Sequence, residues 1–169
     1  MSRKPGLLVL VGVPGAGKTT IGKELSSQTG VDFFDSDEEI VERTGSSVSH
    51  LFIEKGEPFF RQIERDVVAE GLKRSDGVYA LGGGAVLDPA TRELLKGVNV
   101  CWLKVSAPVA AKRVGLDQPR PVLLGNVRSQ MVKLLNEREP FYKEVATFSV
   151  DTDEKAPSEV VLDVMAKNQ

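Results

Sequence analysis

The chain has 169 residues, of which 41% are hydrophobic and 27% are charged, and its formal net charge is -2. This length suits one good hydrophobic core and therefore a single domain. The slightly acidic balance excludes a general binder of nucleic acids, since such proteins carry a surplus or a stripe of basic residues, so any bound anion must be held by a focused site.

The first apolar run leads into a loop of the pattern G-x-x-x-x-G-K-[ST], which occupies residues 12–19. A buried strand, a glycine loop and a helix start form a phosphate cradle, because the loop N–H groups and the positive end of the helix point at one anion. Gly15 and Gly17 let the backbone come close to the phosphates. Lys18 is placed for the β- and γ-phosphates, and the Thr19 hydroxyl is placed to ligate Mg²⁺.

Beyond this loop, hydrophobic periodicity and glycine or proline breaks predict strands that alternate with helices. The expected strands are 7–11, 31–35, 78–81, 98–105 and 147–150. The expected helices are 17–30, 38–44, 48–56, 57–72, one from 89, 106–114, 127–139 and one from 157. The segment 115–125 holds two prolines and is expected to be a lid. This alternation indicates an α/β protein with a parallel sheet and helices on both faces.

The fourth predicted strand contains the single cysteine, Cys101. It cannot form an intrachain disulfide, so we expect a buried thiol in a reducing compartment. The apolar run that follows Met1 to Pro5 is too short for a membrane span and lacks a cleavage signal. We therefore expect a cytoplasmic protein that does not associate with membranes, with a monomer as the default.

Asp35, Ser36 and Asp37 follow the second predicted strand. Ligands of open α/β sheets bind at the carboxyl ends of the strands, so both carboxylates are expected beside the phosphate cradle, on one side of an extended stretch. They can hold the hydration shell of Mg²⁺, accept hydrogen bonds from a substrate hydroxyl, or take its proton. The alternative is a solvated helix start, where acidic residues favour the helix dipole.

Two arginines on predicted helices are candidates for substrate binding. Arg61 lies three residues before Glu64, and a surface pair between them would contribute only about 0.2–0.5 kcal/mol and needs no function. Arg138 lies on the apolar face of its helix, where burying an unpaired guanidinium is costly. A ligand is the natural partner, and two arginines in one pocket would clamp a planar carboxylate. The alternative for Arg138 is a side chain that reaches the surface.

Three further features are less specific signals of function when each is taken alone. Gly82, Gly83 and Gly84 follow the third predicted strand and offer bare backbone that a small ring can approach. Arg120, between two prolines of the predicted lid, can act as an arginine finger or remain solvated. The single histidine, His50, is expected at the surface.

Taken together, these residues resemble the shikimate kinase family over nearly the whole chain. The carrying motifs are the loop 12–20, Phe34-Asp35-Ser36-Asp37, Gly56-Glu57, Phe60-Arg61-Gln62-Ile63-Glu64, Leu81-Gly82-Gly83-Gly84-Ala85, Arg120-Pro121, and Arg138 with Pro140-Phe141-Tyr142. The resemblance implies a P-loop NTPase fold of the nucleoside-monophosphate-kinase type. In that fold a five-stranded parallel sheet has the order 2-3-1-4-5, with a lid at about 115–125 and a substrate-binding region at about 35–62.

The resemblance further implies transfer of the ATP γ-phosphoryl group to the 3-hydroxyl of shikimate, on the route to chorismate, with Mg²⁺ as cofactor. The implied substrate-binding residues are Asp37, Arg61, Gly82, Gly83, Gly84 and Arg138. The implied ATP-binding residues are Gly15, Ala16, Gly17, Lys18, Thr19, Thr20, Arg113, Arg120 and Lys155. The implied catalytic residues are Lys18, Asp37, Arg120 and Asp35, and Thr19 would ligate Mg²⁺ with Asp35 nearby through water.

The chain departs from the family pattern in two places. Lys155 stands where relatives often carry arginine, which keeps the charge and loses the planar stacking surface. The lid reads Arg120-Pro121-Val122-Leu123-Leu124 instead of the commoner Arg-Pro-Leu-Leu. A gluconate kinase or nucleoside-monophosphate kinase remains the alternative within this fold, and a non-catalytic ATP-binding regulator is the alternative from another class.

Overall fold

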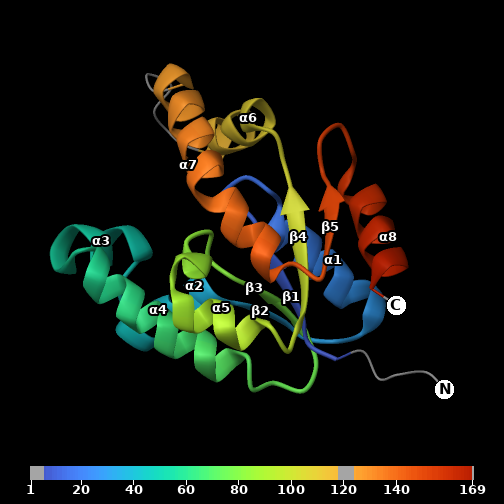
Figure 1. Cartoon of the computed structure of the whole chain (residues 1–169), viewed down its shortest axis with the longest axis horizontal. Helices are drawn as coiled ribbons and strands as arrows, with labels where there is room; N and C mark the ends of the chain where they lie inside the picture. Colours follow the sequence, from blue (N-terminus) through green and yellow to red (C-terminus); the bar gives the residue numbers. More distant parts are fainter. Residues whose placement is uncertain (1–5, 118–123, 169) are drawn as a thin grey trace.

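A five-stranded parallel sheet lies at the centre of the computed structural model, which describes residues 6–117 and 124–168 (Figure 1). The strands are β1 (Leu8–Val11), β2 (Phe33–Asp35), β3 (Val78–Ala80), β4 (Asn99–Lys104) and β5 (Phe148–Asp151). They are hydrogen-bonded in the order β2-β3-β1-β4-β5. The predicted α/β architecture and the strand order are therefore confirmed.

Helices cover both faces of this sheet. They are α1 (Lys18–Thr29), α2 (Ser36–Thr44), α3 (Val48–Lys55), α4 (Glu57–Gly71), α5 (Pro89–Leu95), α6 (Ala107–Asp117), α7 (Leu124–Val145) and α8 (Pro157–Lys167), with a 3₁₀ turn η1 (Ala85–Leu87). α1 and α8 pack together on one side, while α5 and α7 lie on the other (Figure 1). Beyond the β2 edge, α2, α3 and α4 form a separate group of helices.

The central strands are continuous apolar runs because both of their faces are buried in the core. All four residues of β1 are buried, because helices cover both faces of a parallel sheet. A second small cluster of Ile40, Leu51, Phe60 and Val67 joins α2, α3 and α4. This cluster holds together the region that carries Asp37 and Arg61.

α7 differs from the prediction, which ended this helix at Glu139. The helix continues through Pro140 to Val145. Proline removes one backbone hydrogen bond from the helix interior, but the next turn buries Tyr142 and Val145 in the core. The burial of these two side chains outweighs the lost bond.

Two other boundaries also differ. α2 begins at Ser36, so Asp37 lies in the first turn of a helix and not on the predicted extended stretch. The predicted loop of 115–125 is helical at both ends, since α6 runs to Asp117 and α7 begins at Leu124. Arg120, between them, lies outside the described residues.

Cys101 is completely buried in β4, as predicted. Burial raises the pKa of its thiol to about 12, so the thiolate form is disfavoured. Within the parts of the chain that the structure describes, no helix is both long and apolar enough to cross a bilayer.

Candidate functional site

The loop between β1 and α1 has the geometry of an anion cradle. Gly15 and Gly17 have φ of 87° and 95°, in the left-handed region that favours glycine. A Cβ at Gly15 would lie only 2.8 Å from the carbonyl oxygen of Ala110. Gly17 caps α1 without any side-chain hydrogen bond. The N–H groups of the first helical turn are therefore available to a bound anion.

Lys18 bends back over this loop. Its Nζ donates to the carbonyl oxygens of Gly12 at 2.6 Å and Val13 at 3.2 Å. Burial lowers the pKa of Lys18 to about 8, and the nearby carboxylates of Asp37 and Asp35 only partly oppose this shift. The charge of this ammonium group therefore depends on what occupies the cradle.

Asp35 links the cradle to α2. Its Oδ1 accepts hydrogen bonds from the N–H groups of Asp37 at 2.8 Å and Glu38 at 3.3 Å, which makes it the N-cap of α2. Its Oδ2 accepts from the Thr19 hydroxyl at 3.3 Å. A hydroxyl and a carboxylate oxygen beside a phosphate cradle are the hard oxygen donors that suit Mg²⁺.

Asp37 shares a cavity with the cradle. The cavity has a volume of about 290 Å³, and its lining includes Lys18, Asp35, Asp37 and Gly83. Burial raises the pKa of Asp37 and the Asp35 carboxylate raises it further, while the charges of Lys18 and Arg61 lower it. A carboxylate of raised pKa thus faces the phosphate site, although its place on α2 differs from the predicted one.

The three glycines after β3 lie among charged side chains from three helices. A Cβ at Gly82 would lie 2.6 Å from Oδ1 of Asp37, and one at Gly83 would lie 3.1 Å from Nη1 of Arg138. A Cβ at Gly84 would overlap the guanidinium of Arg61. The segment 82–84 therefore has no room for side chains unless these charged groups move. The structure brings together Asp37, Arg61 and Arg138 around this segment, as expected.

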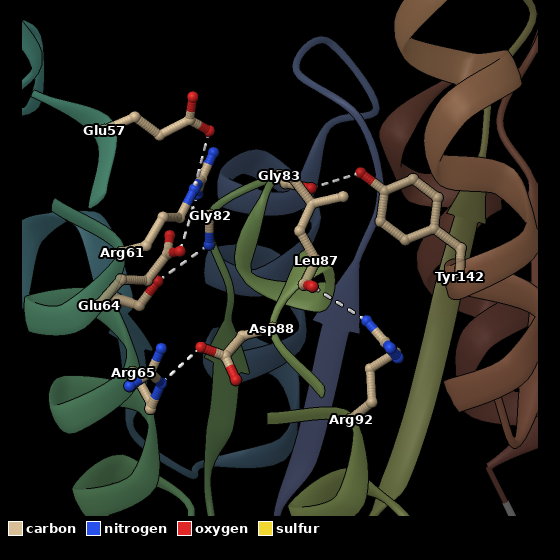
Figure 2. Close-up of polar contacts among 11 residues, drawn as sticks. Glu57, Arg61, Glu64, Arg65, Gly82, Gly83, Leu87, Asp88, Arg92 and Tyr142 are labelled. Carbon is tan, nitrogen blue, oxygen red and sulfur yellow. Dashed lines mark hydrogen bonds and ion pairs between the residues drawn. The ribbon is translucent and has the colours of Figure 1, made fainter. Parts of the chain in front are cut away.

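Arg61 and Glu64 do form an ion pair, but Glu64 is buried, so this is not the surface pair considered as the alternative. Nη1 of Arg61 lies 2.8 Å from Oε1 of Glu64, and Nε lies 3.4 Å from Glu57 (Figure 2). Glu64 is only 3% exposed, and burial raises its pKa while the hydrogen bond from Arg61 lowers it. Glu64 is thus a buried partner that orients Arg61, and sequence reasoning missed it. The available signal was its place between Phe60 and Val67 on the buried face of α4.

Arg138 lies half-buried on α7, with its Nε buried, and so on the inner side of the helix as its apolar pattern indicates. Its Nε has no hydrogen-bond partner among the described residues. Its positive charge contributes to the lowered pKa of Lys18 and opposes the raised pKa of Glu64. A half-buried guanidinium with an unused donor beside Gly83 provides a binding position for an anion.

Arg113 and Lys155 lie behind the cradle. Arg113 donates through Nη1 to the Gly15 carbonyl at 3.0 Å and through Nη2 to the Thr152 carbonyl at 3.1 Å. A cavity of about 260 Å³ joins Arg113, Lys155 and Thr20. Nζ of Lys155 lies 2.8 Å from Asp163. The structure therefore places both residues predicted for nucleotide binding next to the loop.

Comparisons with known proteins agree with this geometry. The model of the shikimate kinase family matches residues 14–169. The shikimate kinase of Thermobifida fusca is 53% identical over 159 residues, covering 94% of this chain and 92% of that protein. The solved structure of a shikimate kinase from Acinetobacter baumannii in complex with shikimate has a TM-score of 0.89 at 35% identity, covering 96% of this chain and 92% of that one. A gluconokinase from Sinorhizobium meliloti covers 99% of this chain and 93% of its own, with a TM-score of 0.65 at 20% identity, and shares the fold alone.

Proposed function

The chain belongs to the shikimate kinase family, and from this premise we propose that ATP and shikimate meet in the cavity between Lys18 and Gly83. The reaction of this ATP-dependent kinase is the transfer of the γ-phosphoryl group to the 3-hydroxyl of shikimate. One observation carries the placement of the two substrates. The phosphate cradle, the Asp37 carboxylate and the glycines Gly82 and Gly83 line a single cavity.

The carboxylate of shikimate binds between the two arginines. Arg138 offers a half-buried guanidinium whose buried Nε has no protein partner among the described residues. Arg61 lies against Gly84 and is oriented by Glu64. Guanidinium groups bind planar carboxylates in two-pronged fashion. The glycines lack side chains, so the ring of the substrate can approach their backbone.

The phosphates of ATP bind in the cradle, with their terminal end toward Asp37. The N–H groups at the start of α1 and the ammonium of Lys18 hold the β- and γ-phosphates. Arg113 and Lys155 lie at the far side of the loop, where they flank the nucleoside. Arg120 remains a prediction from the sequence.

Mg²⁺ fits the oxygen donors beside the cradle. The Thr19 hydroxyl would ligate the ion and Asp35 would hold its water shell, since these two groups lie 3.3 Å apart. When bound, the ion would neutralise negative charge on the phosphates.

Asp37 accepts a hydrogen bond from the 3-hydroxyl and takes up its proton as transfer proceeds. Its raised pKa makes it a better proton acceptor than an ordinary aspartate. Phosphoryl transfer passes through a loose transition state, so positioning of the hydroxyl and charge stabilisation by Lys18 supply most of the acceleration.

The direct test is an assay that couples ADP release to a spectroscopic signal, with the full chain. We expect ADP only when ATP, Mg²⁺ and shikimate are all present, and we expect no release with gluconate or AMP as acceptor. ADP production that does not depend on shikimate, or that is faster with gluconate, would contradict the proposal.

The lowered pKa of Lys18 predicts that nucleotide binding is coupled to proton uptake. Lys18 has a pKa of about 8 in the free protein, and a phosphate beside it favours the charged form and raises that pKa. Above pH 8 the free lysine is largely neutral and must gain a proton, so ADP affinity falls as the pH rises from 8 to 9.5. Calorimetry in buffers of different ionisation enthalpy at pH 8.5 measures the uptake. We expect the uptake to vanish in Lys18→Met, and equal uptake in that variant would assign the proton elsewhere.

A further inference from the structure

The motif Pro140-Phe141-Tyr142 has no role in the reaction described above. Tyr142 follows Arg138 by four residues on α7, so both side chains lie on one face of the helix. The Tyr142 hydroxyl donates a hydrogen bond of 2.6 Å to the carbonyl oxygen of Gly83 (Figure 2). Nη1 of Arg138 lies 3.1 Å from the position that a Cβ of the same glycine would take. One face of α7 therefore contacts Gly83 twice, once through each side chain.

The hydrogen bond of Tyr142 is built into the core. The side chain is completely buried, and its ring packs against Trp102 with centroids 5.9 Å apart. Burial raises the pKa of the hydroxyl to about 12, so it stays protonated and able to donate at neutral pH. The bond is thus a permanent part of the free protein and does not depend on a ligand.

Hydrogen bonds of its own Nε to described residues do not hold the Arg138 side chain in place. Its Nε has no hydrogen-bond partner within the described part of the chain. Pro140 lies between Arg138 and Tyr142 and cannot donate the backbone hydrogen bond that an ordinary residue would give at this point of the helix. Since the helix is weakened here, contacts with other elements must fix the direction of this turn.

Arg92 makes a second set of contacts between α7 and the segment that follows the triple glycine. Its Nη1 donates to the carbonyl oxygens of Val86 at 2.8 Å and Leu87 at 3.0 Å. Its Nε lies 2.9 Å from Glu144, and its guanidinium lies 4.4 Å from the ring centroid of Phe141. The segment that follows the triple glycine is therefore bound to the end of α7 on both sides of Tyr142.

α4 contacts this segment from the opposite side. Arg65 of α4 pairs with Asp88, one helical turn beyond Arg61 (Figure 2). The backbone of 82–88 thus lies between the helix that carries Arg61 and the helix that carries Arg138. The spacing of the two arginines is set by how each helix is attached to this segment.

We propose that Tyr142 is a positioning residue, which holds α7 at the distance from Gly83 that places the Arg138 guanidinium on the substrate carboxylate. The inference rests on the proposed function, because it assumes that Arg138 binds shikimate. Tyr142 acts through Arg138 and Gly83 and does not touch the phosphates. Its loss therefore affects acceptor binding selectively.

The test removes the hydroxyl alone, as Tyr142→Phe. We expect the KM for shikimate to rise roughly three- to tenfold, as for one lost hydrogen bond, with the KM for ATP unchanged. The matched control is Tyr79→Phe, since Tyr79 is the only other tyrosine, is buried, and donates to the Val67 carbonyl. It removes the same atom, and we expect no change in either KM. Thermal unfolding of both variants separates loss of stability from loss of positioning.

Two further variants separate the role of Tyr142 from the assignment of the substrate. Arg92→Lys keeps the charge and loses the planar guanidinium that contacts Val86, Leu87 and Glu144, so we expect a smaller rise in the shikimate KM than for Tyr142→Phe. Arg138→Ala reports on the proposed function itself. If Arg138→Ala raises the shikimate KM and Tyr142→Phe does not, the role of Tyr142 is overturned while the substrate assignment stands. If Arg138→Ala also leaves the shikimate KM unchanged, the substrate assignment fails. Equal rises of the KM for ATP and for shikimate in Tyr142→Phe would overturn the positioning role.

Discussion

Replacing Asp37 with asparagine is expected to lower kcat for shikimate phosphorylation by roughly 10²–10⁴-fold, the usual contribution of a positioned general base. Asparagine keeps the size of the side chain and can still bond the hydroxyl, so substrate binding should change little. The loss is expected in kcat because the amide cannot take the proton. Steady-state kinetics with shikimate and ATP varied separately measure both effects.

The control for this variant is Glu38→Gln. Glu38 lies next to Asp37 in the first turn of α2, where it is exposed. It carries the same favourable charge at the helix start without facing the cavity, so we expect kcat within about twofold of the parent. A kcat for Asp37→Asn that matches the Glu38→Gln value would remove Asp37 from the mechanism.

The pH profile separates a base from an orienting group. A base must be ionised, so kcat/KM should fall as the pH drops through the pKa of Asp37. Burial and the Asp35 carboxylate raise this pKa, so the fall should begin at higher pH than for an ordinary aspartate. Asp37→Asn should lose this acidic limb. A limb that persists in the variant would mean that another group titrates there.

The sequence predicted the sheet and the cradle because both depend on local patterns. Buried parallel strands are apolar runs, and the G-x-x-x-x-G-K-[ST] loop has one structural context. The strand order was available only through the family resemblance. The end of α7 was predicted wrongly because the breaking tendency of Pro140 is local, whereas the burial of Tyr142 that overrides it is a tertiary effect.

Charged residues of the site were harder to predict than glycines. Glu64 stands at a spacing from Arg61 that is equally typical of an exposed pair, and only the packing of α4 distinguishes the two cases. Arg138 was recognised because an arginine on an apolar helix face has few alternatives. The contact between Tyr142 and Gly83 joins residues far apart in the chain, and no local pattern indicates it.

Replacing Arg138 with alanine is expected to weaken shikimate binding by at least about 30-fold, equivalent to ~2 kcal/mol or more for a hydrogen-bonded charge pair. ATP binding should stay within about threefold, because the cradle does not use this side chain. Calorimetric titration with each ligand measures both constants. Arg138→Lys keeps the charge and loses the two-pronged geometry, so we expect partial recovery. Equal losses for ATP and shikimate would show that the acceptor pocket lies elsewhere.

The matched control is Arg128→Ala, which removes an exposed arginine from the same helix and should change neither constant. Stability gives an independent check on why Arg138 is retained. The Nε of Arg138 is buried without a hydrogen-bond partner among the described residues, so the free protein bears a desolvation cost at this atom. Arg138→Ala should therefore unfold at the same temperature as the parent or higher, while shikimate should raise the unfolding temperature of the parent alone. A protein that keeps this arginine despite its cost to folding is one in which the substrate supplies the missing partner.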